Sequence, residues 1–222
     1  MSKRSTLLGR PVGASGEETR RRIIEATGRC VAEVGYSQAT IREIARVAQV
    51  TSGTLYHYFP NKAELIKAAV AEMSAVALPR LTDAVDRSDG VLDKLTEIFD
   101  ECARINRDYP YAAAFDRAIR AESARHLKLG EHSESMLAAL RTVIADVLRQ
   151  GKREGALGPG VDVPGASNAI LTMIRGLNEH ATMASSREYR STVRALKALV
   201  RGKLFDYDAL SGQPVDPLPH TH

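Results

Sequence analysis

Hydrogen-bonding side chains of several kinds lie close together in one short stretch of the chain, and their chemistry suits the edges of nucleic-acid bases. Hydroxyls occur at Thr51, Ser52 and Thr54, and a phenol and an imidazole follow at Tyr56 and His57. The major groove of DNA presents donors and acceptors that such groups can bind, and it admits one α-helix. If this stretch forms the first turns of a helix, the sequence predicts a surface that contacts DNA.

Local signals place these side chains on the second of two short helices. Thr40 is expected to cap the first helix, with Glu43 reaching back to complete a capping box. A turn at 49–50 follows, and Thr51 or Ser52 can cap the second helix. Because a helix of about two turns is marginal alone, it must pack against a neighbour.

The expected neighbour is an upstream helix that runs from Ser15 to Gly35. Ser15 and Glu18 form a second capping box at its start. Asn61 and Glu64 repeat the same device at the start of a fourth helix. The sequence therefore predicts a unit of three packed helices that a fourth helix leaves.

Spacing alone does not separate a DNA-binding helix-turn-helix from an ordinary helical hairpin with a solvated polar face. The order of residues does, because it closely resembles the DNA-binding domain of the tetracycline-repressor (TetR) family of bacterial transcription regulators. The segments that carry the resemblance are Arg20 to Ile24, Gly35-Tyr36, Thr40 to Ala45, Val50 to Tyr56 and Phe59 to Lys62. Two positions depart from the family pattern: Gln49 replaces the usual Gly of the turn, and Val31 replaces a common Phe.

The resemblance implies an all-α fold, with an N-terminal helix-turn-helix head and a larger C-terminal helical domain that binds a ligand and dimerises. It also implies roles for individual residues at the DNA. Phosphate contacts at the start of the second helix are expected from Thr40 and Arg42. The residues expected to face the groove are Thr51, Ser52, Gly53, Thr54 and His57. Tyr56 and Lys62 are expected to hold the DNA backbone.

The charge of the chain supports this division. Residues 1–62 carry ten Lys and Arg against five Asp and Glu, whereas residues 63–222 carry 21 against 22. The formal excess of +4 therefore lies in the head. A double-stranded DNA partner follows, with binding that falls steeply as salt rises. A generic basic surface is the alternative, and it is less favoured because the charge is confined to the segment with the motif.

Composition, together with the positions of helix-breaking Gly and Pro residues, divides the chain into four parts. Residues 1–16 form a flexible basic arm, 17–62 the DNA-binding domain, 63–205 the helical effector-binding and dimerisation domain, and 206–222 a disordered tail. No apolar run has the length of a signal peptide or a membrane span, so we expect a cytoplasmic protein without a membrane partner. Cys30 and Cys102 are expected to be buried free thiols in a reducing compartment.

After the head the chain is expected to be helical, with an apolar period near 3.6 residues. Pro79 is expected to end or kink the fourth helix, Ala63 to about Arg87, which joins the head to the body. One apolar face of the next helix is expected to contain Leu92, Leu95, Ile98, Phe99, Cys102 and Ile105. Two late amphipathic helices, 166–184 and 188–205, follow a loop rich in Gly and Pro.

These two late helices have two possible roles. They can simply cover the core of one chain, or they can pack against their copies as a four-helix homodimer interface, as the resemblance implies. Ile170, Leu171, Ile174 and Leu177 line the first, and Val193, Leu196, Leu199, Val200 and Leu204 line the second. We favour the homodimer, because one short recognition helix covers too few base pairs and a two-fold assembly matches a palindromic site.

The centre of the body is where the resemblance places a pocket for a small-molecule effector of unknown identity. The candidate residues are Phe99, Cys102, Tyr111, Phe115, Met136, Leu140, Met173, Leu177 and Asn178. Each of them also fits a plain apolar core. The residues that can face an anionic ligand are Arg104, Arg107, Arg117, Arg120 and Arg125, although a solvated helix face explains them better.

Catalytic sequence motifs are missing. No Glu has a His three residues later, as di-iron bundles require, and no phosphate-binding Gly-rich loop, G-x-S-x-G or H-E-x-x-H occurs. Glu122 and His126 share a helix face, but an exposed pair explains them better than a metal site with His132. We expect no enzyme, no cofactor and no metal.

The function we predict is a ligand-responsive regulator, most simply a repressor that binds a palindromic operator as a dimer and is released by a small molecule. Two alternatives remain open: a helical-bundle ligand-binding protein without operator affinity, and a DNA-binding protein without an effector. The body of about 160 residues favours the regulator, because one DNA-binding module needs far fewer.

Overall fold

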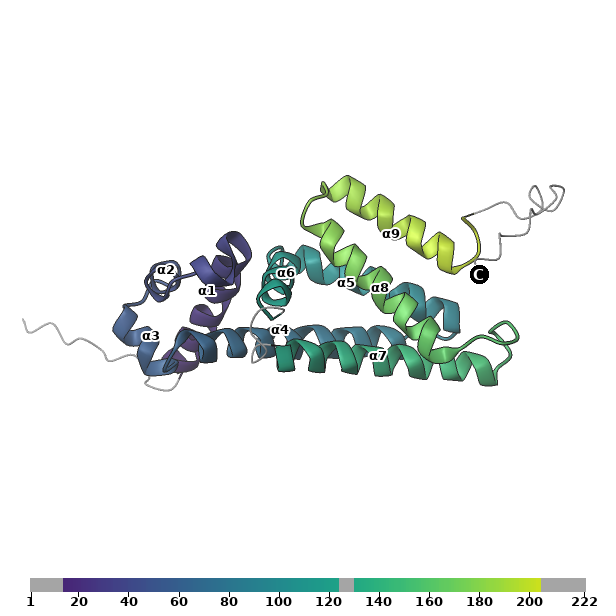
Figure 1. Cartoon of the computed structure of the whole chain (residues 1–222), viewed down its shortest axis with the longest axis horizontal. Coiled ribbons are helices and arrows are strands. Elements are labelled where there is room, and N and C mark those ends of the chain that lie inside the picture. Colours follow the sequence, from purple (N-terminus) through teal and green to yellow (C-terminus); the bar gives the residue numbers. More distant parts are fainter. Residues whose placement is uncertain (1–13, 124–129, 205–222) are drawn as a thin grey trace, which may run out of the picture.

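The computed structural model describes residues 14–123 and 130–204, and these form α-helices without any strand (Figure 1). In chain order the helices are α1 (Ala14–Gln38), α2 (Ile41–Val47), α3 (Ser52–Tyr58), α4 (Lys62–Asp86), α5 (Val91–Asp108), α6 (Ala112–Ser123), α7 (Gly130–Arg153), α8 (Val163–Ala181) and α9 (Ser186–Val200). The all-α fold class is confirmed. Most of the predicted arm 1–16, and the whole tail 206–222, lie outside the described residues.

The short helices begin where the sequence places them. The side-chain oxygens of Thr40, Thr51 and Asn61 accept hydrogen bonds from the backbone three residues later and cap α2, α3 and α4. The reciprocal half of the expected capping boxes is absent at the first and third of these, because Glu43 pairs with Arg46 and Glu64 with Lys67. These carboxylates gain a charged partner on the exposed helix face instead.

The first helix differs from its predicted bounds at both ends. It begins at Ala14, so Ser15 lies inside α1 and is not its N-cap. Gly35 interrupts it with φ 81° and ψ 167°, a conformation essentially confined to Gly, but helical turns resume as far as Gln38. The helix therefore turns at Gly35 and brings its last residues towards α2.

The turn between α2 and α3 places Gln49 in the left-handed region, with φ 56°. Gln49 N donates to Arg46 O at 3.1 Å, and Val50 N donates to Ala45 O at 2.9 Å. These two bonds form a Schellman motif, which usually has Gly at the left-handed position. A Cβ there crowds the backbone, so the turn is strained as the sequence predicts.

Two apolar cores run through the molecule, and α4 belongs to both. The first packs α1, α2 and α3 around Leu55 and Ile44, both fully buried, and continues into the start of α4. The second packs the remainder of α4 with α5, α7, α8 and α9 around Phe99 and Leu177. In Figure 1, α4 extends from the head along the length of the body, beside α7.

Helix α6 was assigned to the body, but its apolar side chains also complete the core of the head. Phe115 and Ile119 are 3% and 1% exposed and pack with the apolar residues of α1 and α4. Gly28 of α1 lies so close that a Cβ there would approach a ring carbon of Tyr111 to 2.7 Å. We propose that the head defined by residues 17–62 folds together with the start of α4 and with α6.

Two predictions about the body helices are wrong, the second of them in part. Leu92 is 45% exposed, and the neighbouring Val91 takes the buried position at the start of α5. Pro79 does not end α4, which continues to Asp86, and a kink at this position stays a prediction. A proline inside a helix costs about 3 kcal/mol. The buried residues on both sides of it, Ala77 and Leu81, pack in the body core and offset that cost.

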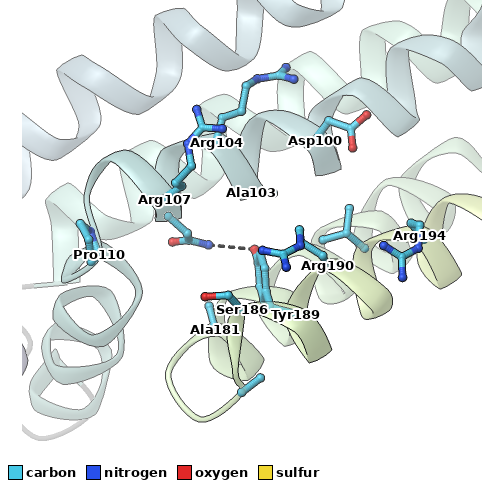
Figure 2. A pocket seen from close by; sticks show the side chains of 13 residues that line it. Asp100, Ala103, Arg104, Arg107, Pro110, Ala181, Ser186, Tyr189, Arg190 and Arg194 are labelled. Atoms are coloured by element: carbon cyan, nitrogen blue, oxygen red, sulfur yellow. Dashed lines mark hydrogen bonds between the residues drawn. The ribbon is translucent and has the colours of Figure 1, made fainter.

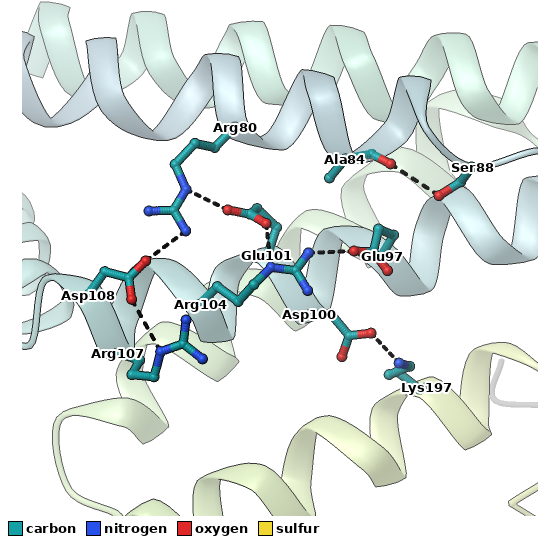
Figure 3. Close-up of polar contacts among 10 residues, drawn as sticks. All are labelled: Arg80, Ala84, Ser88, Glu97, Asp100, Glu101, Arg104, Arg107, Asp108 and Lys197. Atoms are coloured by element: carbon teal, nitrogen blue, oxygen red, sulfur yellow. Dashed lines mark hydrogen bonds and ion pairs between the residues drawn. The ribbon is translucent and has the colours of Figure 1, made fainter.

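A buried carboxylate joins α4 to α5. Glu101 is 4% exposed, and its two oxygens accept from Arg80 Nε at 2.5 Å and from Arg104 Nε at 2.6 Å (Figure 3). Asp108 accepts from Arg80 at 3.0 Å, and Glu97 pairs with Arg104. Burial raises the pKa of Glu101, but the hydrogen bonds from Arg104 and Arg80 outweigh it and leave the pKa below its ordinary value.

Replacing the strained residue of the turn should stabilise the protein. Gln49→Gly removes the Cβ from a left-handed position, so the free energy of unfolding should rise by about 1 kcal/mol. Chemical denaturation monitored by circular dichroism measures the change. Gln49→Ala is the matched control, since it keeps the Cβ and should leave the strain in place. Equal stabilities of the Gly and Ala variants would contradict the strain.

The Glu101 network should make stability depend on pH. Because the folded pKa of Glu101 lies below the unfolded value of about 4.5, its contribution is present above that pH and is lost as the pH falls through the folded pKa. Glu101→Gln should therefore lower the free energy of unfolding by about 1–3 kcal/mol at pH 7, and by less at pH 4 and below. Denaturation of both proteins between pH 3 and 7 measures the difference.

The control for that measurement is Asp146→Asn, which breaks an ion pair with Arg149 on the surface of α7. Exposed pairs contribute little, so this variant should match the wild type across the pH range. A constant difference between Glu101→Gln and wild type at every pH would show that the charge of Glu101 is not what stabilises the contact.

Candidate nucleic-acid interface and effector pocket

Helix α3 lies with one face in the core of the head and the other in solvent. Leu55 is fully buried and Phe59, just after α3, is 5% exposed, so these two side chains anchor the helix. Tyr56 is 53% exposed, and His57 is also exposed. Thr54 is half-buried, and its hydroxyl oxygen lies 2.9 Å from that of Thr51. The outward edge thus presents a phenol, an imidazole and two hydroxyls.

The remaining candidate DNA contacts surround this edge. Thr40, Arg42 and Gly53 are exposed, and Ser52 is half-buried. Arg42 has no hydrogen bond or ion pair to another described residue, whereas its neighbour Arg46 is held by Glu43. A guanidinium at the start of α2 is therefore free to bind a phosphate oxygen. The structure brings all the predicted contacts except Lys62 onto the exposed surface of α2 and α3.

Lys62 has a role inside the protein that the sequence does not reveal. Its ammonium donates to the backbone oxygen of Tyr36, and also to that of Ser37 at 3.4 Å. It lies 4.5 Å from the centre of the Tyr36 ring. Burial lowers the pKa of Lys62, and the charge of Glu122 opposes that change. Lys62 thus fastens the end of α1 to the start of α4, and its phosphate contact stays a prediction.

A small pocket of about 90 Å³ lies in the body, between α4, α5, α6, α7 and α8. We refer to it as the inner pocket. Of the predicted effector residues, Cys102, Leu140 and Asn178 line it. Phe99 and Leu177 are buried in the surrounding core, and Met173 packs against that core. Met136 lies in α7, but its side chain is outside the described part of the structure.

Two of the predicted effector residues, Tyr111 and Phe115, do not line the inner pocket. Tyr111 and Phe115 line a separate groove of about 310 Å³ between α1, α4 and the start of α6. Their apolar character is explained by the core of the head, against which both pack. Sequence periodicity shows which face of α6 is apolar but not which neighbour covers it. The structure therefore does not bring these two rings together with Cys102 and Leu140.

The inner pocket has apolar walls and one polar end. Leu81, Leu137 and Ile174 contribute to the walls. Cys102 is also apolar in effect, because burial raises the pKa of its thiol to about 12 and keeps it protonated at neutral pH. Apolar walls with a few polar groups are typical of small-molecule sites.

The polar end contains Asn106, which the sequence analysis missed, and Arg120, which it named as a possible contact of an anionic ligand. Asn106 lies one helical turn after Cys102 and donates to Asn178 Oδ1 at 3.4 Å. Arg120 binds Asp116 through Nε at 2.9 Å, but its buried Nη2 makes no hydrogen bond and lies 3.6 Å from Glu179. The guanidinium of Arg120 thus has two carboxylate partners, Asp116 and Glu179, although Nη2 is too far from Glu179 for a hydrogen bond. The sequence does place Asn106 four residues after Cys102, and therefore on the same face of the helix, which could have indicated that both line the pocket.

Of the remaining arginines of α6 and the segment after it, the structure describes Arg117 only. Arg117 pairs with Glu179 at 3.7 Å, and Arg125 lies outside the described residues. Over residues 14–123 and 130–204, no three His, Cys, Asp or Glu side chains gather as metal ligands would, and neither His126 nor the side chain of His132 is described. Among the helices of these ranges, none has the length and hydrophobicity that a membrane span requires.

Known proteins share both the head and the overall fold. Residues 23–69 match the family described as "Bacterial regulatory proteins, tetR family". The chain is 30% identical over 174 residues to the HTH-type transcriptional regulator TtgR of Pseudomonas putida, covering 72% of this chain and 79% of TtgR. The family match covers much of α1, all of α2 and α3, and the start of α4.

Solved structures give the same result for the fold. A TetR transcription regulator from Haloarcula marismortui ATCC 43049 matches with a TM-score of 0.71 at 19% identity, covering 84% of this chain and 98% of that one. The regulator FadR of Bacillus subtilis, solved in complex with stearoyl-CoA, matches with a TM-score of 0.70 at 23% identity, covering 83% and 96%. Taken with the similarity to TtgR, these findings show that the chain belongs to the TetR family, whose members are ligand-responsive, DNA-binding regulators of transcription.

Proposed function

We propose that this protein is a repressor that occupies a palindromic operator as a homodimer and leaves it when a small molecule binds the body. The observation that carries the proposal is the outward edge of α3, where Thr54, Tyr56 and His57 stand on a helix anchored by Leu55. A reading helix needs this combination of a rigid support and exposed donors and acceptors. The excess positive charge of residues 1–62 favours the approach of DNA.

The dimer interface of this proposal lies on the outward faces of α8 and α9. Their most apolar residues are already used inside one chain, since Ile170, Leu171 and Val193 are buried in the body core. The opposite faces expose small side chains as well as charged ones such as Arg187 and Glu188. Leu199, near the end of α9, is 38% exposed, and Met183, just after α8, is 73% exposed. The small outward residues of this face are Ala169, Thr172, Gly176, Ser191 and Ala195. Small residues allow two helix pairs to approach closely, and the same patch on each subunit gives two-fold symmetry.

The proposed response to a ligand uses the helices that the head and the body share. Ala113 and Asp116 of α6 line the inner pocket, while Phe115 and Ile119 of the same helix pack in the head. Helix α4 also contributes to both cores. A ligand that prefers one arrangement of α4 and α6 will shift the population towards the corresponding spacing of the two heads. The stearoyl-CoA complex of FadR supports a ligand-binding body.

Operator binding tests the assignment of the reading face. Thr54→Ala and His57→Ala should each lower affinity for the operator by about 1–3 kcal/mol and change base preference. Tyr56→Ala should weaken binding to all sequences alike, because a phosphate contact carries no sequence information. Fluorescence anisotropy with DNA from the region upstream of the gene, against scrambled DNA, measures both effects. Thr142→Ala, an exposed threonine of α7, is the control.

Unchanged operator affinity in all three variants would show that the reading face is elsewhere. If the wild type binds neither DNA, the protein would be a helical-bundle ligand-binding protein without operator affinity. A protein that binds the operator but is never released by a small molecule would be a DNA-binding protein without an effector.

Oligomeric state tests the dimer face. Thr172→Arg places a charge at the centre of the outward face of α8, so the dimer should dissociate and operator affinity should fall at least tenfold with the loss of the second head. Analytical ultracentrifugation and anisotropy measure the two effects. Thr142→Arg is a matched control, because both threonines are exposed and donate to the carbonyl four residues earlier. A Thr172→Arg variant that stays dimeric would place the interface elsewhere.

A further inference from the structure

An open groove of about 600 Å³ lies between α5 and α9 and is much larger than the inner pocket. We refer to it as the outer groove. Figure 2 shows Arg104 and Arg107 on the α5 side, and Arg190 and Arg194 on the α9 side. The tyrosine Tyr189 lies between the two sides and is 8% exposed.

Only on the α5 side of the outer groove are the positive charges neutralised by carboxylates. Arg104 is paired with Glu97 and Glu101, and Arg107 with Asp108. The one carboxylate of the groove lining, Asp100, is held by Lys197 (Figure 3). The α5 side therefore keeps little net charge.

The two guanidiniums on the α9 side have no such partners. Arg190 and Arg194 make no hydrogen bond or ion pair with any residue in the described ranges, and they stand one helical turn apart. Like charges at this spacing destabilise a helix. A bound anion would remove that repulsion, and guanidiniums match the geometry of carboxylate and phosphate oxygens.

Asn106 lines both the outer groove and the inner pocket. Its amide donates to the hydroxyl of Tyr189 at 2.9 Å and to Asn178 at 3.4 Å. Burial raises the pKa of Tyr189 to about 12 against the opposing hydrogen bond from Asn106, so the hydroxyl keeps its proton at neutral pH. That proton has no acceptor among the described residues. These three side chains form a narrow polar partition between a charged space and an apolar one.

We propose that the effector is an amphipathic anion whose apolar part enters the inner pocket and whose anionic group lies in the outer groove against Arg190 and Arg194. The inference rests on the proposed function and names the chemical class of the ligand. The molecule crosses the partition beside Asn106, where the Tyr189 hydroxyl can donate to it. The anionic group is a carboxylate or a phosphate, since both accept paired hydrogen bonds from guanidiniums.

Isothermal titration calorimetry on the full chain tests the proposal, since binding is measured without DNA. The probes are octyl phosphate, octanoate, 1-octanol and inorganic phosphate. At least one of the two amphipathic anions should bind at least tenfold more tightly than 1-octanol and inorganic phosphate. An amphipathic anion occupies both the inner pocket and the outer groove, whereas 1-octanol has no anionic group and inorganic phosphate has no apolar part. The comparison of octyl phosphate with octanoate shows which anion the groove prefers.

Two variants and a matched control locate the anion. The double substitution Arg190→Ala and Arg194→Ala should weaken the binding of the preferred amphipathic anion by about tenfold or more, as expected for the loss of charged hydrogen bonds. It should leave the affinity for 1-octanol unchanged. Arg187→Ala is the control, because Arg187 is an exposed arginine of α9, also without a partner among the described residues, that lies outside the groove. Cys102→Phe should fill the inner pocket and weaken both octyl probes.

The results separate this inference from the proposed function. Equal loss in the Arg187 control, no loss in the double variant, or no binding of any probe to the wild type would overturn the anion site. If octyl phosphate binds through the two arginines but leaves the operator complex intact in anisotropy, the anion site stands and the release mechanism fails. Because both arginines are exposed, circular dichroism should show that the double variant remains folded.

Discussion

The contact between α1 and α6 is the constraint on which the rest of the molecule depends. Gly28 brings the backbone of α1 so close to Tyr111 that a methyl group there would overlap the ring. This approach lets Phe115 and Ile119 reach into the core around α1 and become buried. A small three-helix head buries little surface by itself, and short helices need outside packing. The head is thus stabilised by a helix that also forms a wall of the inner pocket.

Because α6 packs in both the head and the body, the position of the head depends on the packing of the body. A separate head on a flexible linker could bind DNA without regard to the state of the body. Here α4 passes through both cores, with Leu65 and Ile66 in one and Leu81 and Val85 in the other. The tolerance of Pro79 inside α4 follows from the same packing, since residues on both sides of it, Ala77 and Leu81, are buried in the body core. A displacement of α4 or α6 must therefore change the packing of both the head and the inner pocket.

The sequence predicted best the features that depend on neighbours in the chain. The caps at Thr40, Thr51 and Asn61 were found because a capping side chain bonds to a residue three positions away. The strain at Gln49 was found because a helix-turn-helix turn needs a left-handed residue there. Apolar periodicity likewise found the helices of the body and their approximate faces. The resemblance of the head to a known family supplied the candidate DNA contacts, whose roles stay predictions.

Features that depend on distant partners could not be predicted in this way. The pattern of α6 shows an apolar face but does not show that Phe115 packs in the head, away from Cys102. The fastening of Lys62 to the carbonyl of Tyr36 requires the fold, since the two residues are 26 positions apart. At the start of α5, Leu92 and Val91 fit the apolar period almost equally well, and only the packing decides which is buried. Tertiary contacts thus assign the partners that local rules leave open.

The size of the inner pocket constrains how a ligand could act in the proposed mechanism. Its volume of about 90 Å³ is smaller than the roughly 150 Å³ of a protein cavity that holds benzene. An effector of ordinary size must therefore move the walls apart, and these walls include Ala77 of α4 and Ala113 of α6. A ligand shifts the equilibrium between two arrangements of the walls only by the difference in its affinity for them. If the pocket is too small for the ligand in one arrangement, that difference in affinity is large. Because coupling is reciprocal, a head position that DNA favours would in turn oppose expansion of the pocket and weaken ligand binding.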